Sequence, residues 1–292
     1  MKQIIRHIEF NNKTNPRSYF ELVRIEKLLT REMDHDIGKN HMVKFFIIFF
    51  VLEGEGYHTI DFVDYKYQQG TVLLIRRDQI QKFFRSTNVK GYLLVFTEDF
   101  IISHLNQLEA LKAFQLFNEL LSFPKIELDK AKEEYENFVS LVRQLEWEYH
   151  FKDEYSIGIA RSTLHILITK LFRIKSKNHQ HLKEKKYLAE FLAFQQMVEK
   201  NCFENKKVID YAREMGFSTK TLNNIVQAIV NKPAKRFIDE IAIMQIKRLL
   251  IGTNHPIKTI AYASGFEDPT NFFRYFKKYV GSSPEVFRKS HQ

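Results

Sequence analysis

Cysteine is almost absent from this chain of 292 residues, where Cys202 stands alone. A single thiol can form neither an internal disulfide nor a cysteine-based zinc site, and this favours a reducing compartment. Long apolar runs are missing too, since no stretch reaches the roughly 18 residues that a membrane-spanning helix needs. Residues 1–17 are too polar for a signal peptide. We therefore expect a cytoplasmic protein without membrane association.

The chain has no excess of acidic residues. Basic residues outnumber them, and the excess is concentrated in one part of the chain. From Lys175 to the C-terminus there are 21 Lys and Arg against 11 Asp and Glu, whereas the rest has 24 of each kind. The net charge of +10 thus belongs to the C-terminal part. Such asymmetry is typical of a domain that binds a polyanion, because Lys and Arg release counterions from phosphates.

The first half of the chain predicts a β-domain followed by two helices. Residues 41–84 and Gly91–Phe96 contain short runs of β-branched and aromatic residues separated by turn residues, which indicates a small barrel or sandwich. Apolar residues then recur every three or four positions in Tyr135–Tyr149 and Ile157–Leu171, which predicts amphipathic helices. Their apolar faces either cover the barrel or pack against a second subunit, and the sequence leaves both alternatives open.

The second half reads as a separate helical domain. Residues 175–186 are dense in charge and lack periodicity, so we expect a linker there. From Tyr187 onward the apolar periodicity is helical throughout. Within it one pattern occurs twice: Ala212 lies four residues before Gly216, and Ala261 lies four residues before Gly265. Alanine lets two helices cross closely, and glycine accepts the positive φ of a tight turn.

Each glycine is followed by a residue that can cap a new helix. Ser218 serves the first repeat, and Asp268 followed by Pro269 serves the second. This is the pattern of a helix-turn-helix unit, whose second helix enters the major groove of DNA. The segment Pro233–Leu250 between the repeats predicts a connecting helix of about 27 Å. Such a helix can hold two recognition helices about 34 Å, or one DNA turn, apart.

The outward positions of the two recognition helices are the candidate DNA contacts. Amide, guanidinium and aromatic groups suit base edges, and the remaining basic residues suit phosphates. The candidate base contacts are Thr219, Lys220, Asn223, Asn224, Thr270, Asn271, Phe273 and Arg274. The candidate phosphate contacts are Lys235, Arg236, Lys277 and Lys278.

Two segments resemble a known family at this point. Residues 257–290, IKTIAYASGFEDPTNFFRYFKKYVGSSPEVFRKS, are similar to the C-terminal signature of the AraC/XylS family of bacterial transcription regulators. Residues 51–83 are similar to the cupin-like effector domain that often precedes it. Two positions depart from the family pattern: Asn231 stands where glycine is usual, and Ile246 stands near a position that is usually small.

The resemblance implies an α+β protein with a cupin-like β-barrel and a C-terminal double helix-turn-helix. The expected segments are a sensor domain over 1–125, a helical dimerisation or cover segment over 126–174, a linker over 175–186 and a DNA-binding domain over 187–292. We expect a regulator that binds double-stranded DNA in the nucleoid, contacts RNA polymerase, forms a homodimer and responds to a small-molecule effector. No cofactor and no catalytic residue are expected.

A cupin enzyme with a helical accessory domain is the alternative from another functional class. Metal-binding cupins offer two histidines one residue apart, a later glutamate and a further histidine. Here His41 and His58 lie far apart, and Lys82 occupies the position for the later histidine. The only His-x-His pair, His179 and His181, falls in the predicted linker. The ligand set for catalysis is therefore missing. A third interpretation is an architectural protein that binds DNA without sequence preference.

Overall fold

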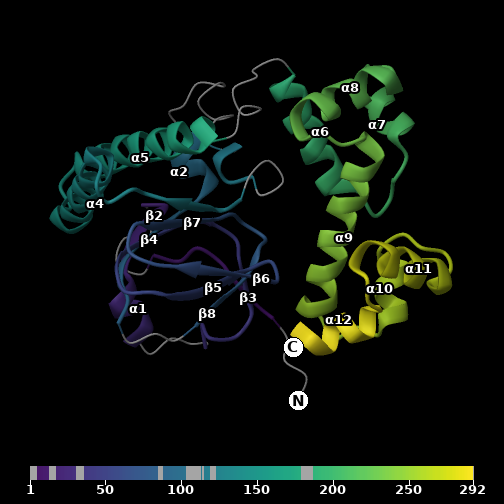
Figure 1. Ribbon diagram of the computed structural model, residues 1–292, viewed down its shortest axis with the longest axis horizontal. Coiled ribbons are helices and arrows are strands. Elements are labelled where there is room, and N and C mark those ends of the chain that lie inside the picture. Colours follow the sequence, from purple (N-terminus) through teal and green to yellow (C-terminus); the bar gives the residue numbers. More distant parts are fainter. Residues whose placement is uncertain are drawn as a thin grey trace. The chain divides into compact units, whose positions relative to one another are not determined.

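A computed structural model describes residues 5–12, 18–30, 36–84, 88–102, 113, 115–118, 123–178 and 187–291. The chain divides into two compact units, Arg6–His179 and Gln180–Gln292, and the second also includes Met1–Ile5. Figure 1 shows the strands in the first unit and a purely helical second unit. The predicted α+β fold class is confirmed.

Strands dominate the first unit. They are β1 (Arg6–Ile8), β2 (Phe20–Arg24), β3 (His41–Val43), β4 (Phe46–Glu53), β5 (Gly56–Ile60), β6 (Val63–Tyr67), β7 (Thr71–Ile75), β8 (Ile80–Phe83), β9 (Lys90–Phe96) and β10 (Lys125–Glu127). Its helices are α1 (Ile25–Thr30), α2 (Glu98–Ile102), α4 (Glu133–Phe151) and α5 (Ser156–Asn178).

The second unit contains α6 (Leu188–Asn201), α7 (Val208–Glu214), α8 (Thr219–Val230), α9 (Ala234–Gly252), α10 (Ile257–Ala263), α11 (Pro269–Val280) and α12 (Pro284–His291). Across the described ranges of both units, no helix combines the length and the apolar character needed to cross a bilayer.

The strands form two five-stranded sheets, in the orders β1-β3-β8-β5-β6 and β10-β7-β4-β9-β2. Among the described residues, no hydrogen-bonded strand pair joins one sheet to the other. The predicted barrel is therefore an open two-sheet structure. The edge strands are β1 and β6 in one sheet and β10 and β2 in the other, and each of them pairs on one side only.

Strand β4 lies at the centre of the second sheet and is buried on both faces. Its alternate residues Phe49 and Val51 belong to the core between the two sheets. Ile48 and Phe50 point to the opposite face and join a second core beneath the helices. Because successive side chains of a strand point to opposite faces, burial of both faces explains the uninterrupted run FFIIFF.

Helices α4 and α5 cover the outer face of this sheet (Figure 1). The ring of Phe138 in α4 packs edge-on against Phe50 with the centroids 4.9 Å apart. The predicted apolar stripes of both helices are largely buried there: Tyr135, Phe138, Val142 and Leu145 in α4, and Ala160, Leu164, Ile168 and Leu171 in α5. Of the two alternatives that the sequence left open, the structure shows the first, because these stripes cover the sheet.

The predicted linker overlaps the end of α5. Residues 175–178 belong to this helix, and residues 179–186 lie outside the described residues. Lys175 is buried, and its Nζ donates a hydrogen bond of 2.7 Å to the carbonyl oxygen of Leu116. A lysine that appeared to belong to a solvated segment thus contributes to the packing of the first unit.

The histidines of the sheets form part of the core. His58 is fully buried, and its ring packs against Phe49 and Phe83 at centroid distances of 5.5 and 4.4 Å. Burial, together with the nearby His41, lowers the pKa of His58 to about 3, so its imidazole is neutral at physiological pH. No cluster of three His, Cys, Asp or Glu side chains in the described parts of the chain could hold a metal ion. His35, His179 and His181 lie outside those parts.

Helix α4 is fixed to the second sheet by one charged contact. Arg24 in β2 donates two hydrogen bonds of 2.6 Å to the carboxylate of Glu146, and the Tyr92 hydroxyl donates a third of 2.9 Å. Burial alone would raise the pKa of Glu146, but the bonds from Arg24 and Tyr92 outweigh it and hold this pKa below its ordinary value. The carboxylate therefore stabilises the fold in its charged form.

We expect Glu146→Gln to lower the free energy of unfolding by about 1 kcal/mol at neutral pH, because a bidentate pair is lost at a partly exposed site. A carboxylate whose pKa is lowered by folding stabilises the protein at pH values above its unfolded-state pKa of about 4.3. This stabilisation is lost as the pH falls through its folded-state pKa. The difference between variant and wild type should therefore vanish in acid. Urea unfolding from pH 7 to pH 3 measures it, with the exposed Glu154→Gln as control. A pH-independent difference would contradict this account.

Candidate nucleic-acid interface

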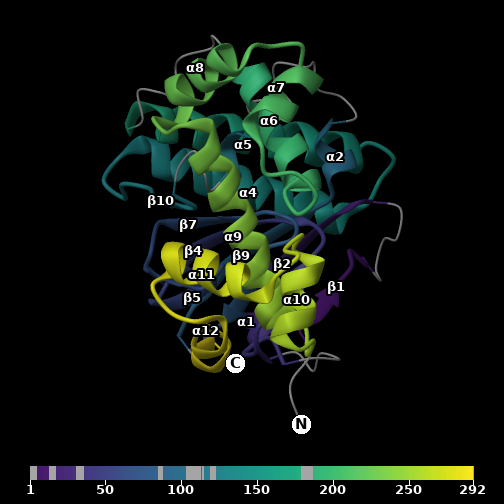
Figure 2. The ribbon, with the colours of Figure 1, turned by 90° about the vertical axis from the view of Figure 1, so that its right-hand side faces the viewer.

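The long helix α9 is the axis of the second unit. It contains 19 residues, a length of about 28 Å, and packs against α6, α7 and α8 as well as α10, α11 and α12. Figures 1 and 2 show α8 and α11 at separate levels along it. The predicted connecting helix is confirmed, with bounds at Ala234–Gly252 instead of Pro233–Leu250. Ile246, in a position expected to be small, is fully buried within this packing.

The first helix-turn-helix consists of α7 and α8. Ala212 is buried where the helices meet, and Gly216 has a φ of 71° in the turn. The hydroxyl of Ser218 then accepts a hydrogen bond of 3.0 Å from the backbone N–H of Thr221 and caps α8. At its other end α8 stops at Asn231, which takes the left-handed conformation with a φ of 53°. These local predictions are confirmed.

The second helix-turn-helix, α10 and α11, repeats this geometry. Ala261 is buried, and Gly265 has a φ of 77°. The carboxylate of Asp268 accepts a hydrogen bond of 2.8 Å from the N–H of Thr270, with Pro269 in the first turn of α11. The helix ends at Gly281, whose φ of 83° is also left-handed. The sequence pattern therefore predicts both helix-turn-helix motifs correctly.

Most of the candidate base contacts lie on the exposed faces of α8 and α11. The exposed residues are Thr219, Lys220 and Asn224 on α8, and Thr270, Asn271 and Arg274 on α11. Asn223 and Phe273 are half-buried. The buried faces carry Leu222 and Ile225 on α8 and Phe272 and Phe276 on α11. Each recognition helix thus has one face in the core and one face open to a partner.

Asn223 has a structural role that the sequence did not reveal. Its side-chain oxygen accepts a hydrogen bond of 3.0 Å from the N–H of Ala234, the first residue of α9. Its amide nitrogen donates one of 3.0 Å to the carbonyl oxygen of Thr219. The first N–H groups of a helix have no partner within it, so Asn223 caps α9 from the neighbouring helix. Both polar atoms of this candidate base contact are engaged.

The candidate phosphate contacts fall into two groups. Lys235 pairs with Asp239 at 2.5 Å, and Arg236 pairs with Glu240 at 3.2 Å. Lys277 and Lys278 are exposed at the end of α11. Neither Lys277 nor Arg274 forms an ion pair with another described residue. The basic charge of α11 is therefore directly available to an anion, whereas that of α9 is partly neutralised by its own helix.

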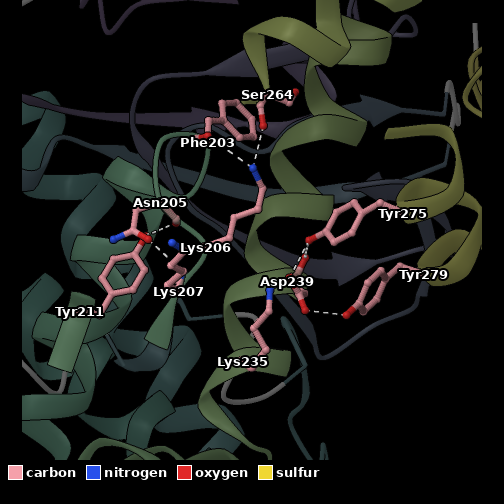
Figure 3. A network of polar contacts seen from close by, with 10 residues as sticks. All are labelled: Phe203, Asn205, Lys206, Lys207, Tyr211, Lys235, Asp239, Ser264, Tyr275 and Tyr279. Atoms are coloured by element: carbon pink, nitrogen blue, oxygen red, sulfur yellow. Dashed lines mark hydrogen bonds and ion pairs between the residues drawn. The ribbon is translucent and has the colours of Figure 1, made fainter. Parts of the chain in front are cut away.

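Asp239 anchors the second recognition helix to α9. It is buried, and it accepts hydrogen bonds from the hydroxyls of Tyr275 at 2.9 Å and Tyr279 at 2.6 Å (Figure 3). Burial and this carboxylate raise the pKa of Tyr279 to about 12 and raise that of Tyr275 further. Both hydroxyls therefore remain protonated donors at physiological pH.

A second contact joins the two helix-turn-helix units directly. Lys206, in the loop before α7, donates to the carbonyl oxygen of Ser264 at 2.8 Å (Figure 3), and its Nζ lies 4.6 Å from the centre of the Phe266 ring. Burial lowers the pKa of Lys206. A Cβ on Gly265 would lie 1.8 Å from the carbonyl oxygen of Phe203. The turn of the second helix-turn-helix therefore packs against the backbone at Phe203, just before the first helix-turn-helix.

Comparisons with known families agree with this architecture. A helix-turn-helix domain family matches residues 211–290, and the AraC-like ligand binding domain family matches residues 23–146. Together the two matches cover more than half of the chain. The chain belongs to the AraC family of transcription regulators.

Two relatives of this AraC-family chain are named as operon regulators, and both have low identity to it. The melibiose operon regulatory protein of Escherichia coli (strain K12) is 28% identical over 144 residues, which are 48% of this chain and 46% of the relative. The raffinose operon transcriptional regulatory protein RafR of Pediococcus pentosaceus is 25% identical over 83 residues, 28% of this chain and 30% of the relative. The chain thus spans about half the length of the first relative and less of the second.

Two solved structures are similar to this chain with low scores. ToxT from Vibrio cholerae O395 is 15% identical with a TM-score of 0.44, and the match covers 94% of this chain and 99% of that chain. The C-terminal domain of the response regulator AraT from Geobacillus stearothermophilus is 22% identical with a TM-score of 0.32. That match covers 34% of this chain and 82% of the other.

The two turn glycines of this AraC-family chain form a matched pair for mutation. Both have a positive φ, but a Cβ on Gly216 would meet nothing within 4 Å, unlike one on Gly265. We expect Gly216→Ala to cost about 1–2 kcal/mol, the strain of the left-handed conformation. Gly265→Ala should cost at least twice as much, because backbone must also move. Hydrogen exchange of the amides in α9 and α11 measures both losses, and equal losses would contradict the close contact with Phe203.

Proposed function

We propose that this chain is a sequence-specific DNA-binding regulator that contacts two successive major grooves with α8 and α11. The single observation that supports this most is that both recognition helices are fixed to one rigid helix, α9. The anchors are the cap from Asn223 on one side and the bonds of Asp239 on the other. A connecting helix of 19 residues, about 28 Å, can hold the two recognition helices about one DNA turn apart, which suits binding on one face of the duplex.

The roles of the exposed residues follow from their chemistry and position. Arg274 and Asn271 lie in the first two turns of α11, where guanidinium suits guanine and amide suits adenine. On α8, Thr219, Lys220 and Asn224 take the equivalent place, with fewer cationic groups. Lys277 and Lys278 then neutralise phosphates, and Phe273 offers an apolar edge to a thymine methyl. Asn223 joins α8 to the start of α9 through its hydrogen bond with Ala234.

Control by the first unit is the second part of the proposal. Two relatives are named as regulators of the melibiose and raffinose operons. We propose that this chain likewise acts at an operon promoter in the nucleoid, where it contacts RNA polymerase. A small molecule bound by the first unit would favour one DNA-binding conformation over another. Because these two relatives are named as regulators, we favour regulation over the alternative of a cupin enzyme.

The test is a selection of binding sites from random duplex DNA by the full chain at physiological salt. The proposal expects a motif of two blocks about one helical turn, or roughly 10 base pairs, apart. Arg274→Ala should cost about 1–3 kcal/mol and relax selectivity at one base position, while Lys277→Ala should weaken all sites alike and reduce the salt slope by about 1. Equal losses on selected and random DNA for both variants would instead indicate architectural binding.

We also propose that the chain forms a homodimer through the exposed side of α4 and α5. Away from the sheet, α4 exposes Trp147 and Phe151, whose rings stack 4.5 Å apart, and α5 exposes Ile159 and Ile166. Exposed apolar side chains gathered on neighbouring helices are typical of an interaction surface. A second copy of this chain presents the same surface, which suits a symmetric dimer.

Replacing two of these side chains should weaken the dimer without affecting either core. We expect the double variant Trp147→Ser and Ile166→Ser to raise the dimer dissociation constant at least about tenfold, equivalent to about 1.4 kcal/mol. Sedimentation equilibrium of the full chain measures it. The control is Val286→Ser in α12, which is equally exposed but lies in the other unit. An unchanged dissociation constant in the double variant would rule out this interface.

A further inference from the structure

The first unit has a pocket on its helical side, between α2 and α5. Its cavity volume is about 240 Å³. The lining residues are Phe100, Ile101, Gly158, Arg161, Ser162, Leu164, His165 and Ile168. All residues from Gly158 onward lie beyond residue 146, where the match to the AraC-like ligand binding domain ends. Phe100, Ile101, Leu164 and Ile168 belong to the core beneath the helices, so the pocket is separate from the core between the two sheets.

Arg161 is the charged group of this pocket, and its position is fixed. Its Nε donates a hydrogen bond of 3.1 Å to the carbonyl oxygen of Phe100, and its Cζ lies 4.9 Å from the centre of the Phe100 ring. A guanidinium has five N–H donors, and this hydrogen bond uses one of them. The remaining four have no hydrogen-bond or ion-pair partner in the part of the chain that the structure describes.

The rest of the pocket combines apolar walls with two more donors. Ile101, Leu164 and Ile168 provide aliphatic surface, and each belongs to the apolar core on this side of the sheet. Ser162 and His165 follow Arg161 on α5 at intervals of one and four residues, and both line the same cavity. Arginine pairs with planar carboxylates through two parallel N–H donors.

We infer that this pocket binds a small monocarboxylate, with the carboxylate on Arg161 and an apolar body against Ile101, Leu164 and Ile168. His165 and Ser162, which line the same cavity, supply additional polar contacts. One fixed cation matches one negative charge, whereas a dianionic phosphate would bring excess negative charge to apolar walls. A ligand of about six to ten non-hydrogen atoms fits a cavity below the usual range of about 300–1,000 Å³.

The ligand would act on the helical layer of the first unit. Phe100 and Ile101 belong to α2, and the other lining residues belong to α5, so an occupied pocket joins these helices through one molecule. Ligand that binds only the folded state stabilises it in proportion to the logarithm of its concentration. This inference does not depend on the proposed DNA-binding function, and neither test decides the other.

The experiment measures binding of cyclohexanecarboxylate to the full chain by ligand-observed NMR and by isothermal titration. Cyclohexanecarboxamide, which has the same shape without the charge, is the matched probe. Arg161→Gln removes the pocket cation, and Arg173→Gln removes an exposed cation of the same helix as control. Gly158→Leu fills the mouth, since a Cβ there meets nothing within 4 Å, and Gly158→Ala is its control.

We expect saturable binding of the carboxylate, and at least tenfold weaker binding of the amide. Arg161→Gln should weaken binding by about 10- to 100-fold, the effect of one charged hydrogen-bonded pair. Gly158→Leu should abolish binding, and both controls should stay within about twofold of the wild type. Circular dichroism establishes whether each variant is folded. If Arg161→Gln does not fold, the difference in binding between Gly158→Leu and Gly158→Ala tests the inference.

Three results would overturn the inference. The first is no saturable binding of the carboxylate to the wild type up to about 10 mM, which corresponds to less than about 3 kcal/mol. The second is equal affinity for carboxylate and amide, because the charge would then contribute nothing. The third is unchanged binding in Arg161→Gln or Gly158→Leu, which would place the ligand elsewhere on the chain.

Discussion

The carboxylate of Asp239 is the contact on which the geometry of the DNA-binding unit depends. It lies inside the protein, where an unpaired charge is costly, and besides its ion pair with Lys235 it accepts hydrogen bonds from two tyrosine hydroxyls of α11. The ends of α9 are held in a comparable way. Asn223 caps its first N–H groups, and Arg288 donates a hydrogen bond of 2.8 Å to the carbonyl of Leu250 near its end. Asn223 thus provides the side-chain cap that Pro233 cannot provide at the start of α9, and at the other end Arg288 adds to the bond of 2.8 Å from the Thr253 hydroxyl to the carbonyl of Leu249.

The sequence predicts local features of this unit well and non-local features poorly. The caps at Ser218 and Asp268 and the turn at Gly216 depend on residues within one turn of each other, so spacing alone reveals them. The bond from Asn223 to Ala234 and that from Lys206 to Ser264 join separate elements, and no periodicity indicates them. For this reason the sequence predicts Asn223 as a DNA contact without revealing its bond to the start of α9. An exposed face can be predicted, but the partners of its polar atoms require the fold.

The same limit applies to the first unit. Runs of apolar residues predict its strands, but pairing between strands is set by contacts distant in sequence, so closure into a barrel could not be judged. Helical periodicity identifies α4 and α5 without saying which surface they cover. Lys175 looked like part of a solvated linker because the carbonyl of Leu116, which accepts its hydrogen bond, is far away in the chain. The pocket around Arg161 likewise depends on α2 meeting α5.

Burial of β4 on both faces has a consequence for the synthesis of the protein. This strand is complete about 80 residues before α4 begins, so one apolar face stays uncovered for at least the time that these residues take to be made. At about 5–20 residues per second this interval lasts roughly 4–16 s. Six consecutive apolar residues with high β-propensity are the kind of segment that forms intermolecular sheets. The nascent chain therefore passes through a period of aggregation risk, in which chaperones and the speed of translation affect yield.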